Sequence, residues 1–279
     1  MSETFERSCA HWSEAKRDEM DAFYTLATAD YRILAEAMDW RSWLTERQRI
    51  AGDRPLRLLD VACGSGKFPV ALAAHADVAT APIHPIACAL LDPSAFSISE
   101  ARAALPPPFR PDAEYELPLQ ELACARGAFD IAWATHALYA IPPADLPLAM
   151  ERFLHALGDA GVGVIAHASA DGHYIRFHRD FLAAFGGEAA ELYSSAEQVR
   201  AALTQHGARV ETRALAYENG AAEHARADIE GFLQRCAFDD RFSLDEMLST
   251  EPLASYLASC LSDGRWRFPQ RAELMVVTP

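Results

Sequence analysis

Short apolar runs alternate with longer helix-forming stretches through most of the chain. Leu56 to Val61 is apolar at most positions, which is typical of a parallel strand buried on both faces. Strands that alternate with helices predict a parallel sheet covered by helices on both sides. We therefore predict a doubly wound α/β fold with a mostly parallel, seven-stranded sheet. The expected strands are 56–61, 87–92, 115–117, 128–139 (running into its loop), 161–168, 208–217 and 272–277, and the expected core helices are 66–77, 96–105, 144–157 and 196–206.

Two further segments are predicted to be helical and lie outside this alternation. Residues 3–50 contain neither glycine nor proline, and we expect two or three helices there. Their aromatic residues either pack onto the edge of the sheet or form a lid over the active site. A second helical segment at about 221–261 is interrupted by Pro252, which breaks or kinks a helix. We therefore predict a lid at 1–50 and a core at 51–279 that carries a helical acceptor cap at about 221–261. The aromatic residues of the N-terminal segment are Trp12, Phe23, Tyr24, Tyr31, Trp40 and Trp43.

The first predicted strand leads into a turn that contains two glycines. Asp60 lies at the end of the strand, residues 63–66 (C-G-S-G) follow, and Pro69 falls in the first turn of the next helix. Glycine permits a tight turn and a close approach of the backbone to a ligand. A phosphate-binding P-loop requires G-x-x-x-x-G-K-S/T, which fails here at Val61 and Phe68. The dinucleotide fingerprint requires a third glycine where Pro69 stands.

A second acidic residue ends the second predicted strand. Asp92 is followed by Pro93 and Ser94, and an acid at this place can accept hydrogen bonds from both hydroxyls of a ribose. Asp92 lies 32 residues after Asp60, more than the roughly 20 of a compact unit. A loop with two prolines, residues 79–86, accounts for the excess. The two acids predict a nucleotide site at one edge of the sheet.

Together these stretches resemble the first two motifs of class I S-adenosylmethionine (SAM) methyltransferases, as D-x-A-x-G-x-G and D-P-S. The resemblance implies a Rossmann-like methyltransferase fold, SAM as the cofactor and methyl transfer as the activity. It implies that the glycine turn approaches the methionine end of SAM, that Asp60 helps to bind the ammonium group, and that Leu119 or Gln120 contacts adenine. Gln120 could equally be an exposed loop amide. Ala62 stands where the family usually has its first glycine. The SAM-binding residues implied in this way are Asp60, Ala62, Gly64, Gly66, Asp92, Pro93, Gln120 and Thr135.

Over most of its length the chain is also similar to the histamine N-methyltransferase-like small-molecule methyltransferases. The similarity lies in L-L-D-P-S-A-F-S-I-S-E-A-R, in F-D-I-A-W-A-T-H-A-L-Y and in the late helix ending F-L-Q-R-C-A-F. In that family the position that matches His136 is a glutamine that contacts the substrate. Because histidine stands there in this chain, the resemblance implies the location of the acceptor and leaves its identity open.

His136 and Tyr139 are the candidate catalytic residues. Both follow the fourth strand, at the edge where open α/β sheets bind ligands. His136 is a candidate general base because imidazole titrates near neutral pH. It could instead only hydrogen-bond the substrate, since a methyltransferase can work by proximity alone. Tyr139 could orient or shield the acceptor, or pack in the core. We expect His167 to face the core, and His173 and His178 to lie on different faces of one helix.

The composition limits the partners that we expect. A net charge of −15 argues against a nucleic-acid substrate. The six cysteines form no C-x-x-C pair and the histidines form no H-E-x-x-H motif, so we predict no metal site and reduced thiols in the cytoplasm. No apolar run approaches 18 residues and the N-terminus lacks an apolar core, so we expect neither a membrane span nor a signal peptide. A monomer or a homodimer is equally compatible with the sequence.

The sequence thus predicts a SAM-dependent enzyme that methylates a small molecule in natural-product metabolism. The methyl group would be accepted by a nitrogen or by a carbon of an electron-rich aromatic ring. One alternative is an O-methyltransferase of a small phenol or carboxylate, and another is a SAM-binding protein without catalysis. A nicotinamide oxidoreductase is disfavoured by Pro69 and by the D-P-S ending of the second strand.

Overall fold

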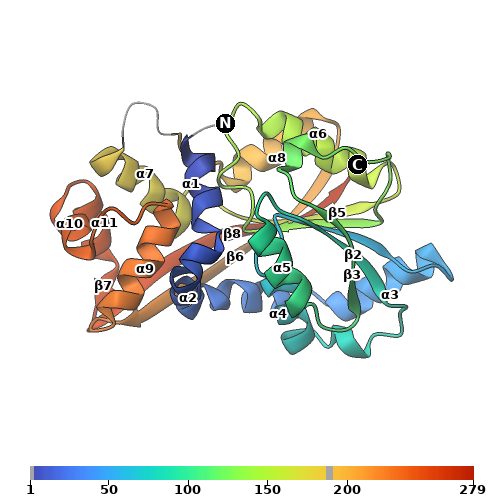
Figure 1. The fold of residues 1–279 in the computed structure, drawn as a ribbon, viewed down its shortest axis with the longest axis horizontal. Helices are drawn as coiled ribbons and strands as arrows, with labels where there is room; N and C mark the ends of the chain where they lie inside the picture. The colour runs from blue at the N-terminus through green and yellow to red at the C-terminus, as the bar shows by residue number, and fades with distance from the viewer. Residues whose placement is uncertain (1–2, 187–190) are drawn as a thin grey trace.

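The computed structural model describes residues 3–186 and 191–279. A single sheet runs through the molecule with strand order β3-β2-β1-β4-β5-β8-β6, and a short β7 pairs with β8 (Figure 1). The first five strands are parallel to one another, whereas β8 is antiparallel to both β5 and β6. The doubly wound fold is confirmed. The strands are β1 Arg57–Val61, β2 Ile86–Leu91, β3 Phe109–Tyr115, β4 Ile131–Thr135, β5 Val162–Ala168, β6 Arg209–Ala222, β7 Leu261–Ser262 and β8 Arg265–Thr278.

Successive residues of the central strands point to opposite faces of the sheet, and each face has its own core. Leu58 of β1 joins the cluster under α2–α5, and its neighbour Leu59 joins the cluster under α6 and α8. This double burial explains why the strands are apolar at nearly every position. The helices are α1 Glu3–His11, α2 Arg17–Glu36, α3 Trp40–Ala51, α4 Lys67–His75, α5 Ala95–Ala104, α6 Leu146–Leu157, α7 His173–Phe185, α8 Ala196–Gln205, α9 Arg226–Ala237, α10 Leu244–Ser249 and α11 Leu253–Ser259, with 3₁₀ turns at Glu14–Lys16, Val78–Thr80 and Leu119–Glu121.

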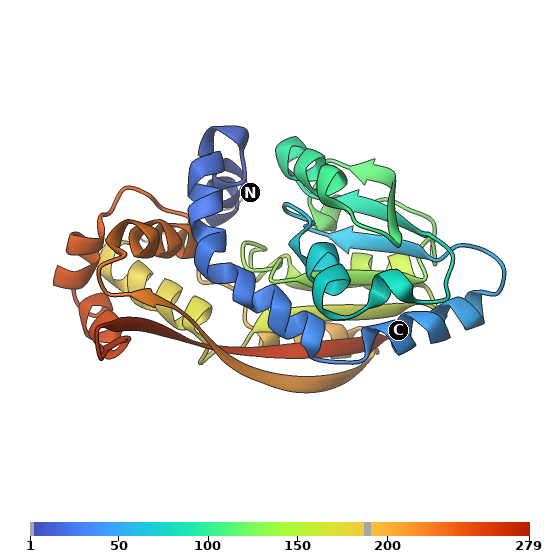
Figure 2. The ribbon, with the colours of Figure 1, turned by 90° about the horizontal axis from the view of Figure 1, so that it is seen from below.

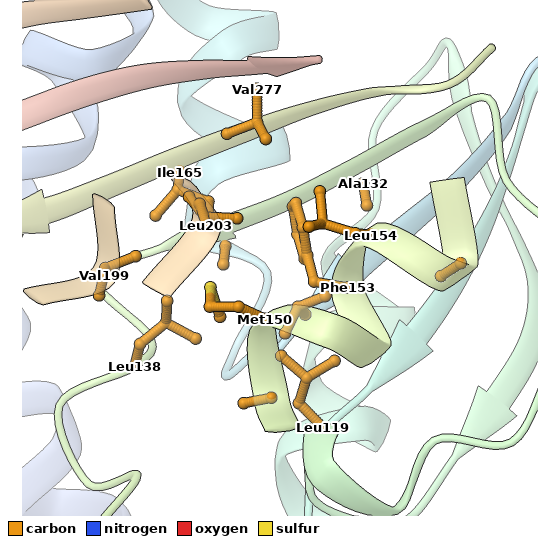
Figure 3. Close-up of a cluster of buried hydrophobic side chains, with 14 of the residues drawn as sticks. Leu119, Ala132, Leu138, Met150, Phe153, Leu154, Ile165, Val199, Leu203 and Val277 are labelled. Atoms are coloured by element: carbon orange, nitrogen blue, oxygen red, sulfur yellow. The ribbon is translucent and has the colours of Figure 1, made fainter. Parts of the chain in front are cut away.

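The core on the α6 and α8 side is a continuous apolar layer. Phe153 of α6 and Leu203 of α8 pack onto Ile165 of β5 and Val277 of β8 (Figure 3). These side chains are fully buried, and burying a side chain of this size stabilises the fold by roughly 1.5–3 kcal/mol. This layer fixes β4 and β5, so the loop that begins after Thr135 starts from a rigid base.

A long ribbon of β6 and β8 extends beyond the sheet and carries a second group of helices. All fourteen residues of β6 pair with β8, from Arg209 with Thr278 to Ala222 with Arg265. β5 pairs only with Ala272 to Val277 of β8. Figure 2 shows the ribbon running from the sheet to the helices α7 and α9–α11, which we call the cap. The cap has its own buried cluster, which also takes in Met20 and Leu26 of α2.

Several predicted strand boundaries were wrong: β4 is shorter than predicted, β6 continues to Ala222, and β3 and β8 begin earlier than predicted. The third strand begins at Phe109, directly after the proline triplet, because β3 is an edge strand and accommodates Pro111. The last strand begins at Arg265, seven residues before its predicted start at Ala272. Pro269 is tolerated there because β8 has only β6 as a ladder neighbour at that point. The predicted break at Pro252 is confirmed, since α10 ends at Ser249 and α11 begins at Leu253.

Candidate active site

A cavity opens at the carboxyl ends of β1, β2 and β4, between the sheet, the N-terminal helices and the cap. Its empty space is about 1320 Å³ including the opening to solvent. The sheet contributes residues 60–64, 91–93 and 135–141, helices α1 and α2 contribute one wall, and the cap contributes another. Of the residues predicted from sequence, those that line it are Asp60, Ala62, Gly64, Asp92, Pro93, Gln120, Thr135, His136 and Tyr139.

Gly66 is the one predicted site residue that does not line the cavity. It has φ +69° and precedes α4, and a Cβ atom there would lie 3.1 Å from Cα of Ala101 in α5. Glycine is therefore required at this position by backbone conformation and by the packing of α4 on α5. Gly64 also has a positive φ, of +51°, but an added Cβ would meet only the Tyr24 hydroxyl, at 3.8 Å.

The glycine turn and the D-P-S motif are joined through one carboxylate. Asp92 accepts a hydrogen bond from the Gly64 N–H at 3.0 Å through Oδ2 and another from the Ser94 N–H at 2.9 Å through Oδ1. Each oxygen keeps a further lone pair, so the carboxylate can still accept from two hydroxyl groups of a ligand. The hydrogen bond from Gly64 to Asp92 joins residues that are 28 positions apart, so the two motifs are in direct contact in the folded chain.

Two buried carboxyl groups, Asp60 and Asp92, line the cavity near the glycine turn without a cationic partner. Burial raises the pKa of Asp92 to about 6, and burial, together with the charge of Asp92, raises the pKa of Asp60 to about 8. Neither forms an ion pair with any residue of the described chain. Oε1 of Gln120 is also buried and accepts no hydrogen bond within the described residues. This set of hydrogen-bond acceptors fits SAM, because Asp60 can bind an ammonium group, Asp92 a ribose and Gln120 an amino group of adenine.

His136 and Tyr139 meet on the other side of the cavity. His136 has φ +53°, and its backbone N–H donates to the Ala166 carbonyl at 2.8 Å, which fixes the loop after β4 on β5. Its Nδ1 lies 2.7 Å from the Tyr139 hydroxyl and its Nε2 lies 3.4 Å from the Tyr217 hydroxyl. Burial lowers the pKa of His136 to about 3, so the imidazole is neutral at physiological pH.

Sequence reasoning missed a third buried carboxyl group in the cavity wall. Asp30 of α2 is 2% exposed and lines the cavity. Its Oδ2 accepts from the Tyr174 hydroxyl at 2.5 Å and its Oδ1 accepts from Nδ2 of Asn219 at 2.9 Å. Burial raises the pKa of Asp30 to about 6, which leaves it mostly ionised at pH 7. An isolated acid in a helix carries no sequence signal, and its partners come from α7 and β6.

The N-terminal aromatic residues divide between the two predicted roles. Trp40 is fully buried in the cluster under α2–α5, and Trp43 packs against the same cluster. The others line the cavity, and for these rings the lid stays a prediction. Those lining it are Trp12, Phe23, Tyr24 and Tyr31, joined by Tyr174 and Tyr193 from the other side.

Three further buried histidines, His167 of β5 and His173 and His178 of α7, contact other residues of the protein. His167 is fully buried, as predicted, and its Nε2 lies 2.8 Å from the Ser194 carbonyl. His173 and His178 have different partners, the Tyr256 hydroxyl and the ring of Tyr193. Within residues 3–186 and 191–279, no three histidine, cysteine or acidic side chains are grouped so that they could hold a metal ion. No helix in that part of the chain is both long and apolar enough to cross a membrane.

Comparison with known proteins identifies the fold and the family. Residues 34–220 match the family model described as a methyltransferase domain, which spans two thirds of the chain. No curated protein matches the sequence. Magnesium protoporphyrin IX methyltransferase from Synechocystis PCC 6803 with bound SAH has a TM-score of 0.56 and 12% identity, over 99% of this chain and 100% of that one. The BH2331 protein of Bacillus halodurans C-125, provisionally assigned as a methyltransferase, has a TM-score of 0.54 and 14% identity, over 85% of this chain and 98% of that one. At such identities the structural likeness shows a shared fold.

Proposed function

The chain belongs to the methyltransferase domain family and is a SAM-dependent methyltransferase, and we propose that it methylates a small amine at nitrogen. The observation that carries the proposal is Asp30, a buried carboxyl group held by two hydrogen bonds in a wall of aromatic rings, in the same cavity as the SAM motifs. The rest of the proposal follows from what that carboxylate and those rings would bind.

Asp30 and the rings around it favour a cation. A carboxylate attracts an ammonium group strongly where water is excluded, and the faces of tyrosine and tryptophan rings attract cations as well. The hydrogen bonds from Tyr174 and Asn219 hold the carboxylate in one orientation. Positive charge develops on the acceptor nitrogen as it takes the methyl group, and a fixed negative group stabilises that charge.

SAM, when bound, supplies a methyl group on a sulfonium, which is already activated for displacement. The residues of the chain then have to align the acceptor with that methyl group and exclude water. In the proposal, Asp60 holds the ammonium group of SAM, Asp92 its ribose, and Gly64, Ala62, Pro93, Gln120 and Thr135 line the remainder of its site. Trp12, Tyr24 and Tyr31 of the N-terminal segment close the cavity as a lid, and the cap closes the acceptor end.

His136 and Tyr139 have positioning roles in this proposal. The sequence similarity to histamine N-methyltransferase-like enzymes supports an acceptor beside His136, since the matching glutamine there contacts the substrate. The neutral imidazole and the Tyr139 hydroxyl offer the acceptor a polar contact on one side. Only a neutral amine has the lone pair that attacks the methyl group, so an acceptor bound to Asp30 as an ammonium ion first gives up its proton, which the Asp30 carboxylate can take. This step does not require His136, whose pKa is lowered by burial.

Methylation of an aromatic carbon is the second candidate, and the aromatic walls favour it. A planar, electron-rich ring would stack on those walls as readily as an amine would bind to Asp30. O-methylation of a phenol has no comparable support, because its lowered pKa makes the His136 imidazole a weak base for a phenolic proton. A role in natural-product metabolism and a cytoplasmic location remain predictions from the sequence.

The Asp30→Asn variant tests the proposal. Asparagine keeps the size of the side chain and removes the charge, so kcat/KM for an amine acceptor should fall by about 10- to 100-fold, as expected for loss of a hydrogen-bonded charge. Calorimetric affinity for SAH should stay at the wild-type value. Asp112→Asn, at an exposed site of β3, is the matched control. Unchanged kcat/KM for amines in Asp30→Asn would contradict the role of Asp30.

A further inference from the structure

Arg235 is a buried cation in the wall of the same cavity, on helix α9 of the cap. Its side chain is 2% exposed. Nη1 donates a hydrogen bond to the His11 carbonyl, and the guanidinium lies 4.6 Å from the centre of the Trp12 ring. These contacts hold the group in a fixed position between α1 and α9.

The other edge of this guanidinium has no partner. Nε and Nη2 are buried and donate to no acceptor in the described part of the chain, and no described carboxylate forms an ion pair with Arg235. Burial lowers the pKa of Arg235 to about 10, which still leaves it charged at neutral pH. A buried charge without a partner is costly, so the free edge is a site for an anion.

Two other arginines show what this edge binds in the same protein. Arg49 donates from Nε and Nη2 to the two oxygens of Glu46, at 2.8 and 2.7 Å. Arg241 donates from the same pair of nitrogens to Asp239, at 2.9 and 2.7 Å. The Nε–Nη2 edge forms a fork that matches the two oxygens of a carboxylate.

We propose that Arg235 binds a carboxylate group presented by a ligand in the cavity. The inference rests on the proposed function, because it assigns a second recognition group to the same acceptor site. Two ligands of the reaction can present a carboxylate, the acceptor and the methionine part of SAM. The place of Arg235 in the cap favours the acceptor. The methionine carboxylate of SAM has another cation nearby, because Lys67 also lines the cavity and directly follows the glycine turn. The acceptor is then a small molecule with an amine for Asp30 and an acid group for Arg235.

Acetate, the smallest organic carboxylate, tests the site without knowledge of the acceptor. Sodium acetate should raise the Tm of the full chain by about 2–5 °C above the effect of sodium chloride at equal ionic strength, if it reaches about ten times its Kd. The extra shift should disappear in Arg235→Gln and stay in Arg49→Gln, whose arginine lies on the surface. Arg235→Met keeps the apolar stem and replaces the first variant if that one does not fold.

Saturating SAH distinguishes the two sources of the carboxylate. An acetate shift that persists with SAH bound assigns Arg235 to the acceptor, and one that SAH abolishes assigns it to the carboxylate of SAM. Equal shifts with acetate and chloride in the wild type, or an acetate shift retained in the Arg235 variants, overturn the proposal. Because no turnover is measured, failure of amine methylation and failure of this site are separate results.

Discussion

The phenolic hydroxyl of Tyr139 lies 2.7 Å from Nδ1 of His136. The same oxygen accepts a hydrogen bond from the Ala168 N–H at 3.3 Å, so its own proton is available for Nδ1. The imidazole then carries its proton on Nε2, towards the Tyr217 hydroxyl at 3.4 Å. With both nitrogens engaged and its pKa lowered by burial to about 3, His136 is better suited to hold the acceptor than to take a proton.

His136→Ala should therefore raise KM for the acceptor and lower kcat by less than about ten-fold, whereas loss of a general base costs roughly 10²–10⁴-fold. His136→Gln should keep most of the activity, because an amide can replace the hydrogen bond to Tyr139. Steady-state kinetics of both variants, with SAH affinity as the control, check the prediction. A loss of kcat above 10²-fold together with a missing limb of the pH profile would restore the general-base role.

Asp92→Ala should weaken SAH binding by about 1.5–3 kcal/mol, because a buried, charged hydrogen-bond acceptor is lost. The change also releases the Gly64 N–H, so the glycine turn loses one hydrogen bond to the end of β2 and keeps the one from the Cys63 N–H to the Leu91 carbonyl. Isothermal titration calorimetry measures the effect, and Asp112→Ala on the exposed side of β3 is the control. Wild-type affinity in the Asp92 variant would show that this acid does not bind the ribose.

Asp60 predicts a pH effect on the ligand-free protein. Its pKa is raised from 3.8 to about 8 by burial and by the charge of Asp92, so the folded chain holds a proton that the unfolded chain releases. The contribution to stability is fully present below the unfolded pKa near 4 and is lost as the pH rises through 8. In thermal unfolding from pH 5 to 8, Asp60→Asn should lose less stability than the wild type. An identical pH dependence in both proteins would contradict a proton on Asp60.

Ligand binding should reverse this protonation. An ammonium group beside Asp60 favours the carboxylate, so SAH binding at pH 7 should release a proton from the wild type and release less from Asp60→Asn. Calorimetry in two buffers of different ionisation enthalpy measures the number of protons released. An equal release from both proteins would assign the proton to another group.

Gly66→Ala should destabilise the fold more than Gly264→Ala does. Both glycines have φ +69°, so alanine meets backbone strain of about 1–2 kcal/mol at each position. A Cβ at Gly66 would also lie 3.1 Å from Cα and 3.2 Å from O of Ala101, whereas the nearest atom to a Cβ at Gly264 is Oε2 of Glu223, at 3.9 Å. The difference in unfolding free energy by urea denaturation should be about 1–3 kcal/mol. Equal losses would show that α4 and α5 move apart easily.

The proposed cofactor half of the site could be predicted from the sequence because its residues lie close together in the chain. Asp60, the glycine turn and the start of α4 lie within a few consecutive residues, and Asp92 ends the next strand in the same way. Their spacing reflects one strand–turn–helix geometry, so the pattern and the structure agree. Only Gly66 differs in its role, since packing against Ala101 cannot be read from the motif.

The acceptor half could not be predicted because it is assembled from distant segments. Asp30 meets Tyr174 and Asn219 across 144 and 189 residues. Arg235 reaches His11 across 224 residues. These contacts depend on the β6–β8 ribbon that places the cap beside α2, and the end of β6 and the first half of β8 were not predicted as strands. From the sequence alone, where this ribbon is not apparent, Asp30 and Arg235 look like ordinary surface charges.

Turnover with SAM that carries a trideuterated methyl group tests the central claim most directly. The purified protein is incubated with a panel of amines, amino acids, indoles, phenols and carboxylates, and mass spectrometry locates the label in each product. The account predicts SAH release and a labelled methyl group on the nitrogen of amine acceptors, lost or strongly reduced in Asp30→Asn. Label found only on oxygen or on ring carbon, or SAM bound without turnover on any member of the panel, would contradict it.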